Sequence, residues 1–303
     1  EKVLKLEEVR ERKRYLLSLL EAKDEKIRSW AWDYILGWGA PESLITREDT
    51  KRLIKLLGSH QESWKELHRL VHRGVITRGE AELLLGFLSS PDERIRTEAW
   101  KNVGFLIDRG LVTVNEVREK REYFLSLLGS ADEKVLQSVW GLDEPYYFKV
   151  PLVELVKRGI LTVGEVKEKR EYFLKLLASN DYTIRERGWI NLPRLMEIGV
   201  ITKEDAEFFL ELLSSPDKTL RSEAWRHIYL LLPDILTLDK VRERKGYFFE
   251  LLRENVWDDL SFLITKGIIT KEDSKEFINL LTSPNERVRS WAWSNSGWLT
   301  QIG

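Results

Sequence analysis

Apolar residues recur along the chain at the spacing of short amphipathic helices. In the segment 117–128 the apolar residues Val117, Phe124, Leu127 and Leu128 fall on one helical face and do not alternate as they would in a strand. Comparable stripes end in a leucine pair at 19–20, 56–57, 127–128, 176–177, 212–213 and 280–281. A short polar turn and a second amphipathic segment follow these stripes. The pattern therefore predicts a series of helical pairs.

A short motif marks the boundary between one helical pair and the next. Two apolar residues are followed by threonine at 44–46, 75–77, 111–113, 160–162, 200–202, 235–237 and 268–270. An acidic residue stands three positions after each threonine except Thr237, where Lys240 occupies that place. Threonine and an acid at this spacing form a capping box, which satisfies the free amides of a helix start. A glycine usually precedes the apolar pair, and it suits the end of the preceding helix.

The second helix of each pair is expected to begin at an aspartate that is followed four residues later by arginine. This spacing occurs at 24/28, 92/96, 181/185 and 217/221, and Asn285 with Arg289 is a variant of it. The stretch from Pro91 to Trp100 reads Pro-Asp-Glu-Arg-Ile-Arg-Thr-Glu-Ala-Trp, and it resembles the HEAT-repeat family of α-solenoids. The resemblance covers nearly the whole chain. It implies that the aspartates and arginines pair along neighbouring repeats.

We therefore expect an all-α fold, a right-handed and curved α-solenoid (superhelix) of about eight HEAT-like helical hairpins without separable domains. The expected units are 1–43, 44–74, 75–110, 111–159, 160–199, 200–234, 235–267 and 268–303. The last residues stop at the glycine that elsewhere precedes a new repeat, and no polar cap is evident there. We expect either a longer native array or a partner at this end.

Tryptophan occupies one repeat position six times, after a small or β-branched residue: Trp32, Trp100, Trp140, Trp189, Trp225 and Trp293. The favoured interpretation is that each ring fills the seam between stacked repeats, since a buried aromatic removes about 150–250 Å² from water. The alternative is an aromatic row that stacks on ligands or unpaired bases. Trp30 and Trp291 lie two residues earlier and are expected to face the concave side or a neighbouring chain.

Composition and charge narrow the possible functions. The chain has 303 residues, with 49 lysines and arginines against 50 acidic residues, so no overall basic field attracts nucleic acid or a membrane surface. No apolar run approaches the ~18 residues of a membrane helix. The absence of cysteine excludes disulfides, cysteine–zinc sites and thiol catalysis. A single methionine and many charged residues are typical of hyperthermophilic proteins. We expect a cytoplasmic protein.

Signatures of catalysis and metal binding are weak. The chain has no Gly-x-Ser-x-Gly elbow, no phosphate-binding loop and no His-Glu-x-x-His motif. His68 and His72 share a helix face, but no third ligand is indicated, so a polar surface is favoured over a metal site. Basic clusters on the first helices are interleaved with acids, which favours solvated i,i+4 pairs over nucleic-acid binding. We therefore predict no catalytic residue, no metal and no cofactor.

An insertion separates Trp140 from Gly159 and places three aromatics between two prolines. Insertions in solenoids emerge as loops, often on a binding face. We therefore expect a non-enzymatic interaction scaffold that binds a protein through its concave inner helices and the loop 141–151. The candidate contact residues are Trp30, Tyr34, Lys101, Arg187, Asn191, Arg226, His227 and Trp291, with Tyr146, Tyr147 and Phe148 in the loop.

The alternative function is nucleic-acid binding. The repeats also resemble those of HEAT-like alkylpurine DNA glycosylases, which use aromatics and an aspartate in a basic concave cleft. That likeness is an analogy at the level of the fold, and it singles out no aspartate of this chain. Sequence-neutral nucleic-acid binding without catalysis is a further possibility. Continuous positive charge on the concave face would favour nucleic acid, whereas mixed charge with exposed aromatics would favour a protein partner.

Overall fold

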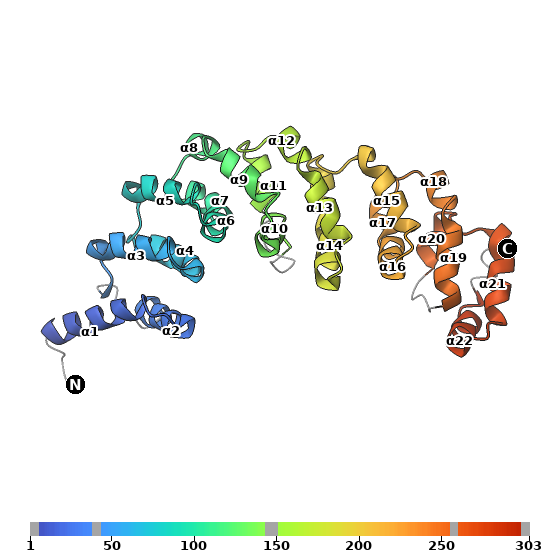
Figure 1. Ribbon diagram of the computed structural model, residues 1–303, viewed down its shortest axis with the longest axis horizontal. Coiled ribbons are helices and arrows are strands. Elements are labelled where there is room, and N and C mark those ends of the chain that lie inside the picture. The colour runs from blue at the N-terminus through green and yellow to red at the C-terminus, as the bar shows by residue number, and fades with distance from the viewer. Residues whose placement is uncertain (1–5, 38–43, 143–150, 255–259, 298–303) are drawn as a thin grey trace. The chain divides into compact units, whose positions relative to one another are not determined.

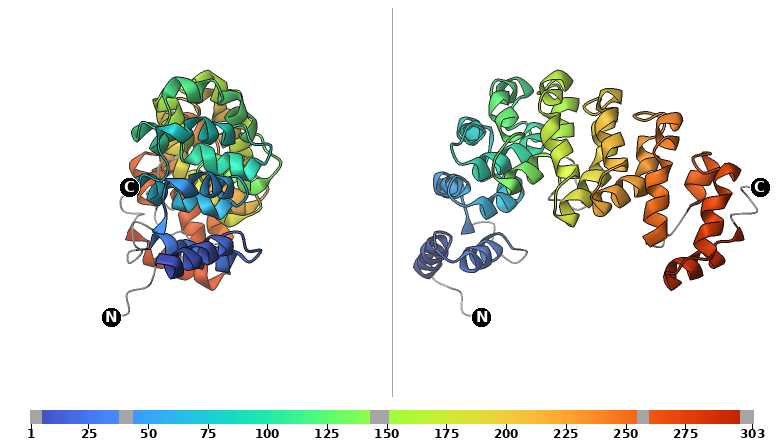
Figure 2. Two further views of the ribbon diagram at one scale, coloured as in Figure 1. Left: turned by 90° about the vertical axis from the view of Figure 1, so that its left-hand side faces the viewer. Right: turned by 45° about the vertical axis from the view of Figure 1, so that its right-hand side comes forward.

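The computed structural model describes residues 6–37, 44–142, 151–254 and 260–297, and every regular element in these ranges is a helix. The contacts divide the chain into two compact units, Glu1–Glu165 and Val166–Gly303. In each unit the helices follow one another as antiparallel pairs that pack on the next pair along the chain (Figures 1 and 2). The all-α prediction is confirmed for the described part of the chain.

The first unit contains α1 (Leu6–Leu19), α2 (Glu25–Leu36), η2 (Arg47–Asp49), α3 (Thr50–Leu57), η3 (Gln61–Glu66), α4 (Leu67–His72), η4 (Arg78–Glu80), α5 (Ala81–Phe87), α6 (Glu93–Lys101), α7 (Val103–Asp108), α8 (Val114–Arg118), α9 (Arg121–Leu127), α10 (Glu133–Val139) and α11 (Pro151–Lys157). Helix α12 (Val163–Lys167) crosses the boundary between the units.

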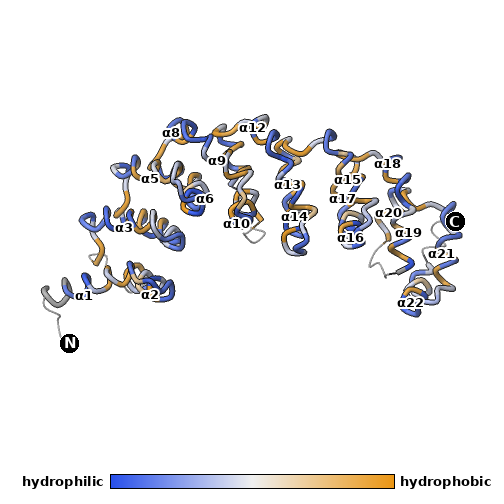
Figure 3. The backbone as a smooth tube through the Cα atoms, viewed as in Figure 1, coloured by the Kyte–Doolittle hydropathy of each residue, from blue (hydrophilic) through white to orange (hydrophobic). Residues whose placement is uncertain are grey.

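The second unit continues with α13 (Arg170–Leu177), α14 (Tyr182–Glu197), η5 (Lys203–Asp205), α15 (Ala206–Leu213), α16 (Lys218–Arg226), α17 (Ile228–Leu231), α18 (Leu238–Arg242), α19 (Lys245–Glu254), α20 (Ser261–Thr265), η6 (Lys271–Asp273), α21 (Ser274–Leu281) and α22 (Glu286–Ser294). Polar residues colour the starts of second helices such as α6, α14 and α16, and apolar residues lie between the paired helices (Figure 3).

The predicted helix boundaries are confirmed by their hydrogen bonds. Reciprocal capping boxes join Thr46 to Asp49, Thr77 to Glu80, Thr113 to Glu116, Thr202 to Asp205 and Thr270 to Asp273. Thr162 and Glu165 exchange the same bonds. Thr237, which lacks the acid, makes no side-chain cap. The preceding glycines take positive φ angles of 65–75°, which only glycine adopts without strain: Gly74, Gly110, Gly159, Gly199 and Gly267.

Aromatic pairs join consecutive repeats. A buried tryptophan of one second helix contacts a phenylalanine on the first helix of the next pair. Ring centroids are 5.6 Å apart for Trp64 and Phe87, 5.3 Å for Trp100 and Phe124, 5.9 Å for Trp189 and Phe209, and 5.1 Å for Trp225 and Phe248. Several indole N–H groups also donate to the carbonyl that ends the preceding first helix, as Trp225 does to Leu213 at 3.0 Å. We call these contacts the Trp–Phe joints.

The predicted tryptophan core is confirmed at five positions and wrong at the sixth. Trp32, Trp100, Trp140, Trp189 and Trp225 are buried, whereas 61% of Trp293 is exposed. Trp293 lies on α22, and the described residues contain no later helical pair that could pack on it. Trp64 occupies the same place in its repeat, ten residues before Gly74 as Trp100 stands ten before Gly110, and it was not predicted. Its repeat has a shorter turn, so its indole reaches the leucine carbonyl of the first helix across seven residues, where Trp100 spans twelve.

Ion pairs also join neighbouring repeats at five junctions. A base on one first helix binds the capping-box acid of the following repeat, as Arg78 binds Glu116 at 2.6 Å. The other pairs are Lys13–Asp49, Arg121–Glu165, Arg170–Asp205 and Lys245–Asp273. Hydrogen bonds from Arg78 and Thr113 lower the pKa of Glu116 to about 2. At least one base of each basic cluster thus binds an acid of the next repeat, where we had expected i,i+4 pairs within one helix, while Arg12 and Arg14 of the same clusters are exposed.

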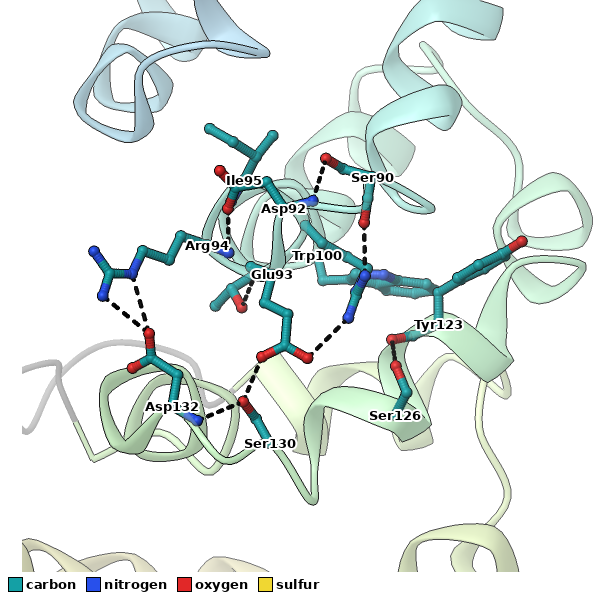
Figure 4. Close-up of polar contacts among 12 residues, drawn as sticks. Ser90, Asp92, Glu93, Arg94, Ile95, Trp100, Tyr123, Ser126, Ser130 and Asp132 are labelled. Atoms are coloured by element: carbon teal, nitrogen blue, oxygen red, sulfur yellow. Dashed lines mark hydrogen bonds and ion pairs between the residues drawn. The ribbon is translucent and has the colours of Figure 1, made fainter.

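The resemblance implies that the aspartate and the arginine four residues after it bind their counterparts in neighbouring repeats. That prediction is wrong for the pairs described here. Each aspartate instead caps its own second helix, as Asp92 accepts from the amide of Arg94 (Figure 4). The arginine four residues later donates to the carbonyl six positions before it, as Arg96 does to Ser90 at 2.6 Å. Both side chains thus make contacts within their own hairpin, and some of these arginines also bind a glutamate of the next repeat, as Arg28 binds Glu62. The links between repeats here are Arg94 with Asp132 and Glu93 with Ser130.

One link between repeats is a fully buried ion pair. Arg185 of α14 makes two hydrogen bonds to Glu223 of α16, at 2.8 and 3.0 Å, and both side chains are about 5% exposed. The guanidinium also donates to the carbonyl of Ser179. Removing one partner would leave the other charge buried and unpaired, which costs more than losing the pair as a whole.

We predict that Trp225→Ala lowers the free energy of unfolding by about 3–5 kcal/mol, because it removes a buried ring from a Trp–Phe joint. Trp293→Ala, at the equivalent but exposed position, should cost less than about 1 kcal/mol. Chemical denaturation followed by circular dichroism measures both. Equal losses would show that the joints do not carry the stability of the stack.

We predict that Arg185→Met lowers the free energy of unfolding by about 3–5 kcal/mol, because the Glu223 carboxylate is left buried without its partner. The double variant Arg185→Met with Glu223→Leu should recover most of that loss. The same denaturation measurement gives the coupling between the two positions. Additive losses in the double variant would contradict the buried pair.

Candidate functional site

A groove in the first unit crosses four consecutive second-helix segments. It has a volume of about 940 Å³, and its lining comes from α2, η3, α4, α6, α7 and α11. In sequence order, the residues that line the groove begin with Glu25 of α2 and end with Leu155 of α11. We call this the second-helix groove. It exists because the Trp–Phe joints hold successive second helices side by side.

The floor of the second-helix groove is aromatic. Half-buried Phe105 and His68 line it, and Trp64 and Trp100, which belong to two joints and are each 1% exposed, lie beneath them. The rings of His68 and Phe105 stack with centroids 3.7 Å apart. Burial lowers the pKa of His68, and His72 and Arg109 lower it further. His68 is therefore neutral at pH 7 and contributes a flat ring to the floor.

The rim of the groove is polar. Glu98 lies 3.5 Å from Lys101 and accepts a hydrogen bond of 3.0 Å from the amide of Gln61. Asp108 is bound at 2.8 Å by Arg158, which does not itself line the groove. Five carboxylates and two lysines make up the charged lining: Glu25, Glu62, Glu98, Asp108 and Glu154, with Lys65 and Lys101.

An exposed aromatic pair lies on the same row of second helices. Trp30 and Tyr34 of α2 are 53% and 55% exposed, and their rings stack with centroids 5.6 Å apart. Both were predicted as contact residues from their position in the repeat. The predicted residue Lys101 is half-buried and lines the second-helix groove. The first unit therefore brings an aromatic pair and a polar, aromatic-floored groove to its second helices.

The candidates of the second unit are arranged differently. Asn191 is buried, and its amide donates to the carbonyl of Arg187 and accepts from Arg194, so it stabilises α14 and does not face solvent. Our expectation that Asn191 contacts a partner is therefore wrong. Arg187 is half-buried and Arg226 is exposed.

Of the remaining predicted contact residues, the structure describes Trp291 and does not describe the three aromatics of the loop 141–151. Trp291 is half-buried on α22. Tyr146, Tyr147 and Phe148 lie outside the described residues. Pro151, the first described residue after them, belongs to the lining of the second-helix groove.

His227 packs against Trp189. The two rings stack with centroids 5.2 Å apart and an interplanar angle of 13°. Burial, together with the charge of Arg226 and against the opposing effect of Glu186, lowers the pKa of His227 to about 4. The buried Nδ1 atom has no hydrogen-bond partner among the described residues. His227 is thus a neutral packing residue at pH 7.

The described residues contain no group of three or more side chains suited to holding a metal ion. His72 Nε2 lies 3.1 Å from an Arg109 nitrogen, and the ring of His68 is stacked on Phe105. Within the described ranges, no helix combines the length and the apolar character needed to cross a bilayer.

No protein-family model and no curated protein matches the chain. The matches are to solved structures. Among solved structures, a designed armadillo repeat protein, YIII(Dq.V1)4CPAF in complex with peptide (KR)4, is 14% identical over 94% of this chain and 98% of its own, with a TM-score of 0.27. An archaeal HEAT-like repeats protein from Thermococcus onnurineus NA1 is 13% identical over 97% and 88%, with a TM-score of 0.20.

Those TM-scores are too low for either structure to serve as a template, so the assignment rests on the repeat geometry of this chain. Helical pairs, capping boxes, positive-φ glycines and joints recur in both units. Each unit is an all-α array of HEAT-like helical hairpins. A HEAT-like solenoid presents one row of second helices, and in the first unit that row carries the groove.

We predict that stability falls as the pH drops from about 6.5 to 4. The unfolded state binds a proton on His227 below its ordinary pKa of 6.5, whereas the folded state binds it only below about 4. The loss should be about 2 kcal/mol, a figure reduced from the full shift because the ring is partly open to solvent. His227→Phe, which keeps the stacking on Trp189, should flatten this part of the pH profile in denaturation experiments. An unchanged profile would rule out the buried neutral imidazole.

Proposed function

We propose that the protein is a non-enzymatic interaction scaffold that binds a protein partner through its second helices. The observation that supports this most directly is the second-helix groove, whose aromatic floor and polar rim extend over four helical segments of the first unit. Such a surface resembles the anatomy of a recognition site, where apolar contact area lies within a hydrogen-bonding rim. A rigid stack presents these side chains at little cost in ordering.

Trp30 and Tyr34 support the same proposal. Large exposed aromatics on a rigid helix are frequent anchors of protein interfaces, and their rings are already ordered by stacking on each other. The loop 141–151 remains a proposed contact, because it leads into Pro151 at the groove. Arg187, Arg226, His227 and Trp291 are proposed contacts of the second unit, with His227 acting through its packing on Trp189.

A protein partner fits the charge better than nucleic acid does. Some bases of the first-helix clusters are bound to acids of the next repeat, as in Arg121–Glu165 and Lys245–Asp273, which reduces the free positive charge of those helices. The lining of the groove holds more carboxylates than amines. Phosphate backbones require the opposite balance.

We predict that a photoreactive p-benzoylphenylalanine at position 34 or 101 forms an adduct with a protein in cells of the source organism. Tyr15 provides a matched control, because it is an aromatic residue of comparable exposure (63%) on the first helix α1. The same probe at position 15 should form little or no adduct. The adduct is detected as a gel shift that persists after nuclease treatment. Mass spectrometry then identifies the crosslinked protein.

Two outcomes of the crosslinking would contradict the proposal. Equal adducts from positions 34 and 15 would show that the second helices are not a preferred surface. Adducts that disappear on nuclease treatment would show that the partner is a nucleic acid.

A further inference from the structure

The helical pair α21 and α22 exposes apolar side chains at repeat positions that are buried elsewhere in the chain. Trp293 of α22 is 61% exposed, whereas the buried tryptophans at the equivalent position are at most 2% exposed. Ile278 of α21 is 54% exposed. Its repeat position is at most 8% exposed in five earlier repeats and half-buried in two others, with the residues Leu17, Ile54, Leu125, Leu210 and Phe249 in the former and Leu85 and Leu174 in the latter.

Both positions lie on the side of a repeat that meets the next repeat. The tryptophan packs on the phenylalanine of the following first helix in the Trp–Phe joints. The position of Ile278 faces the same way, because the ring of Phe249 contacts Phe277 of the following pair with centroids 5.5 Å apart. The described residues contain no pair after α22, so Ile278 and Trp293 form the joint-forming side of a repeat without its neighbour.

An arginine adds a charge to this surface. Arg289 precedes Trp293 by four residues, so both side chains lie on one side of α22. At two interior junctions the equivalent arginine binds the glutamate that stands two residues before the next buried tryptophan, in the pairs Arg28–Glu62 and Arg185–Glu223. Arg289 is half-buried and makes no ion pair in the part of the chain that the structure describes. We call Ile278, Arg289 and Trp293 the α21–α22 end face.

The first helical pair exposes the opposite side of a repeat. Ile27 of α2 is 41% exposed, whereas its repeat position is at most 5% exposed in Ile95, Val135, Ile184 and Val288 and half-buried in Leu220. Trp30, three residues later on the same face of α2, is 53% exposed. Trp30 stands where Glu62 and Glu223 stand in their repeats. We call Ile27 and Trp30, together with Leu16 at the phenylalanine position of α1, the α1–α2 end face.

The two end faces complement each other as the two sides of an interior junction do. A junction accepts leucine at the phenylalanine position, because Trp32 is 2% exposed although the following first helix has Leu53 there. Leu16 is therefore suited to receive a tryptophan in the same way. Trp30 replaces the glutamate that receives the arginine, and an indole face binds a guanidinium through a cation–π contact. Arg289 would thus meet an aromatic ring where Arg185 meets a carboxylate.

The sequence of α22 points to the same occupant. Residues 289–293 read Arg-Ser-Trp-Ala-Trp, as do residues 28–32 of α2. In α2 the joint-forming side of this sequence is covered by the next repeat of the chain, where Arg28 binds Glu62 and Trp32 is buried. The α21–α22 end face therefore fits a helical pair of the kind that this chain itself provides.

We propose that copies of the chain stack end to end, with the α21–α22 end face of one copy packed on the α1–α2 end face of another. The contact continues the repeat–repeat junction from one chain into the next. Because it joins two different surfaces, it leads to a closed ring or an open filament. The inference goes beyond the proposed function and does not depend on it, since neither end face contributes to the lining of the second-helix groove.

Sedimentation velocity over a wide range of protein concentrations tests the stacking. The mass should rise above the 35.7 kDa of one chain as the concentration increases. Trp293→Arg and Ile27→Arg should each weaken the association about tenfold or more, because each places a charge in an apolar contact. Both side chains are exposed in the single chain, and circular dichroism checks that the fold is kept. Leu83→Arg, which changes a side chain of 50% exposure on α5, is the matched control and should leave the association unchanged.

A mixture of the two variants separates end-to-end stacking from other modes of association. Trp293→Arg keeps an intact α1–α2 end face, and Ile27→Arg keeps an intact α21–α22 end face. Each variant alone should sediment as a single chain, whereas their equimolar mixture should form a complex of two chains that grows no further.

Three results would overturn the inference. They are a wild-type protein that keeps the mass of one chain at every concentration, a mixture of the variants that stays monomeric, and an equal loss of association in the Leu83→Arg control. The proposed function is tested separately, because the crosslinking positions 34 and 101 lie outside both end faces. An adduct with a different protein there would stand whether or not the copies stack.

Discussion

The contact between a tryptophan of one repeat and a phenylalanine of the next is the interaction on which the rest of the structure depends. A single helical pair cannot bury its apolar face, so each pair is stable only against its neighbours. At four junctions the Trp–Phe joints close that face, as Trp100 does with Phe124 and Trp225 with Phe248. Trp64 and Trp100 belong to joints and also floor the second-helix groove. The same side chains thus stabilise the stack and shape the candidate site.

Polar contacts fix the register of this stack. A capping-box acid such as Glu116 starts its own helix and binds Arg78 of the preceding repeat, so one carboxylate serves two structural roles. The exception at Thr237 is consistent with this arrangement, because it has no capping acid and makes no side-chain cap. Charged residues that resemble a nucleic-acid surface in the sequence are therefore largely contacts between repeats.

Local signals in the sequence predicted the local structure well. Threonine with an acid three residues later, and glycine before the apolar pair, describe backbone geometry that a few adjacent residues determine. Pairings between repeats depended on neighbours that the sequence does not specify. The aspartates therefore turned out to cap their own helices, and Trp293 turned out to be exposed. Trp64 could have been found from its spacing, because it stands ten residues before Gly74 as Trp100 stands ten before Gly110.

The candidate site was only partly predictable. Lys101, Trp30 and Tyr34 follow from helical phase, whereas the groove requires four repeats in register and the stacking of His68 on Phe105.

The most direct test of the second-helix groove as the interface is hydrogen–deuterium exchange of the protein with and without its captured partner. Our account predicts slower exchange in 61–68, 98–108 and 151–155, with little change in α3, α5 and α9. Slower exchange confined to those first helices would contradict it.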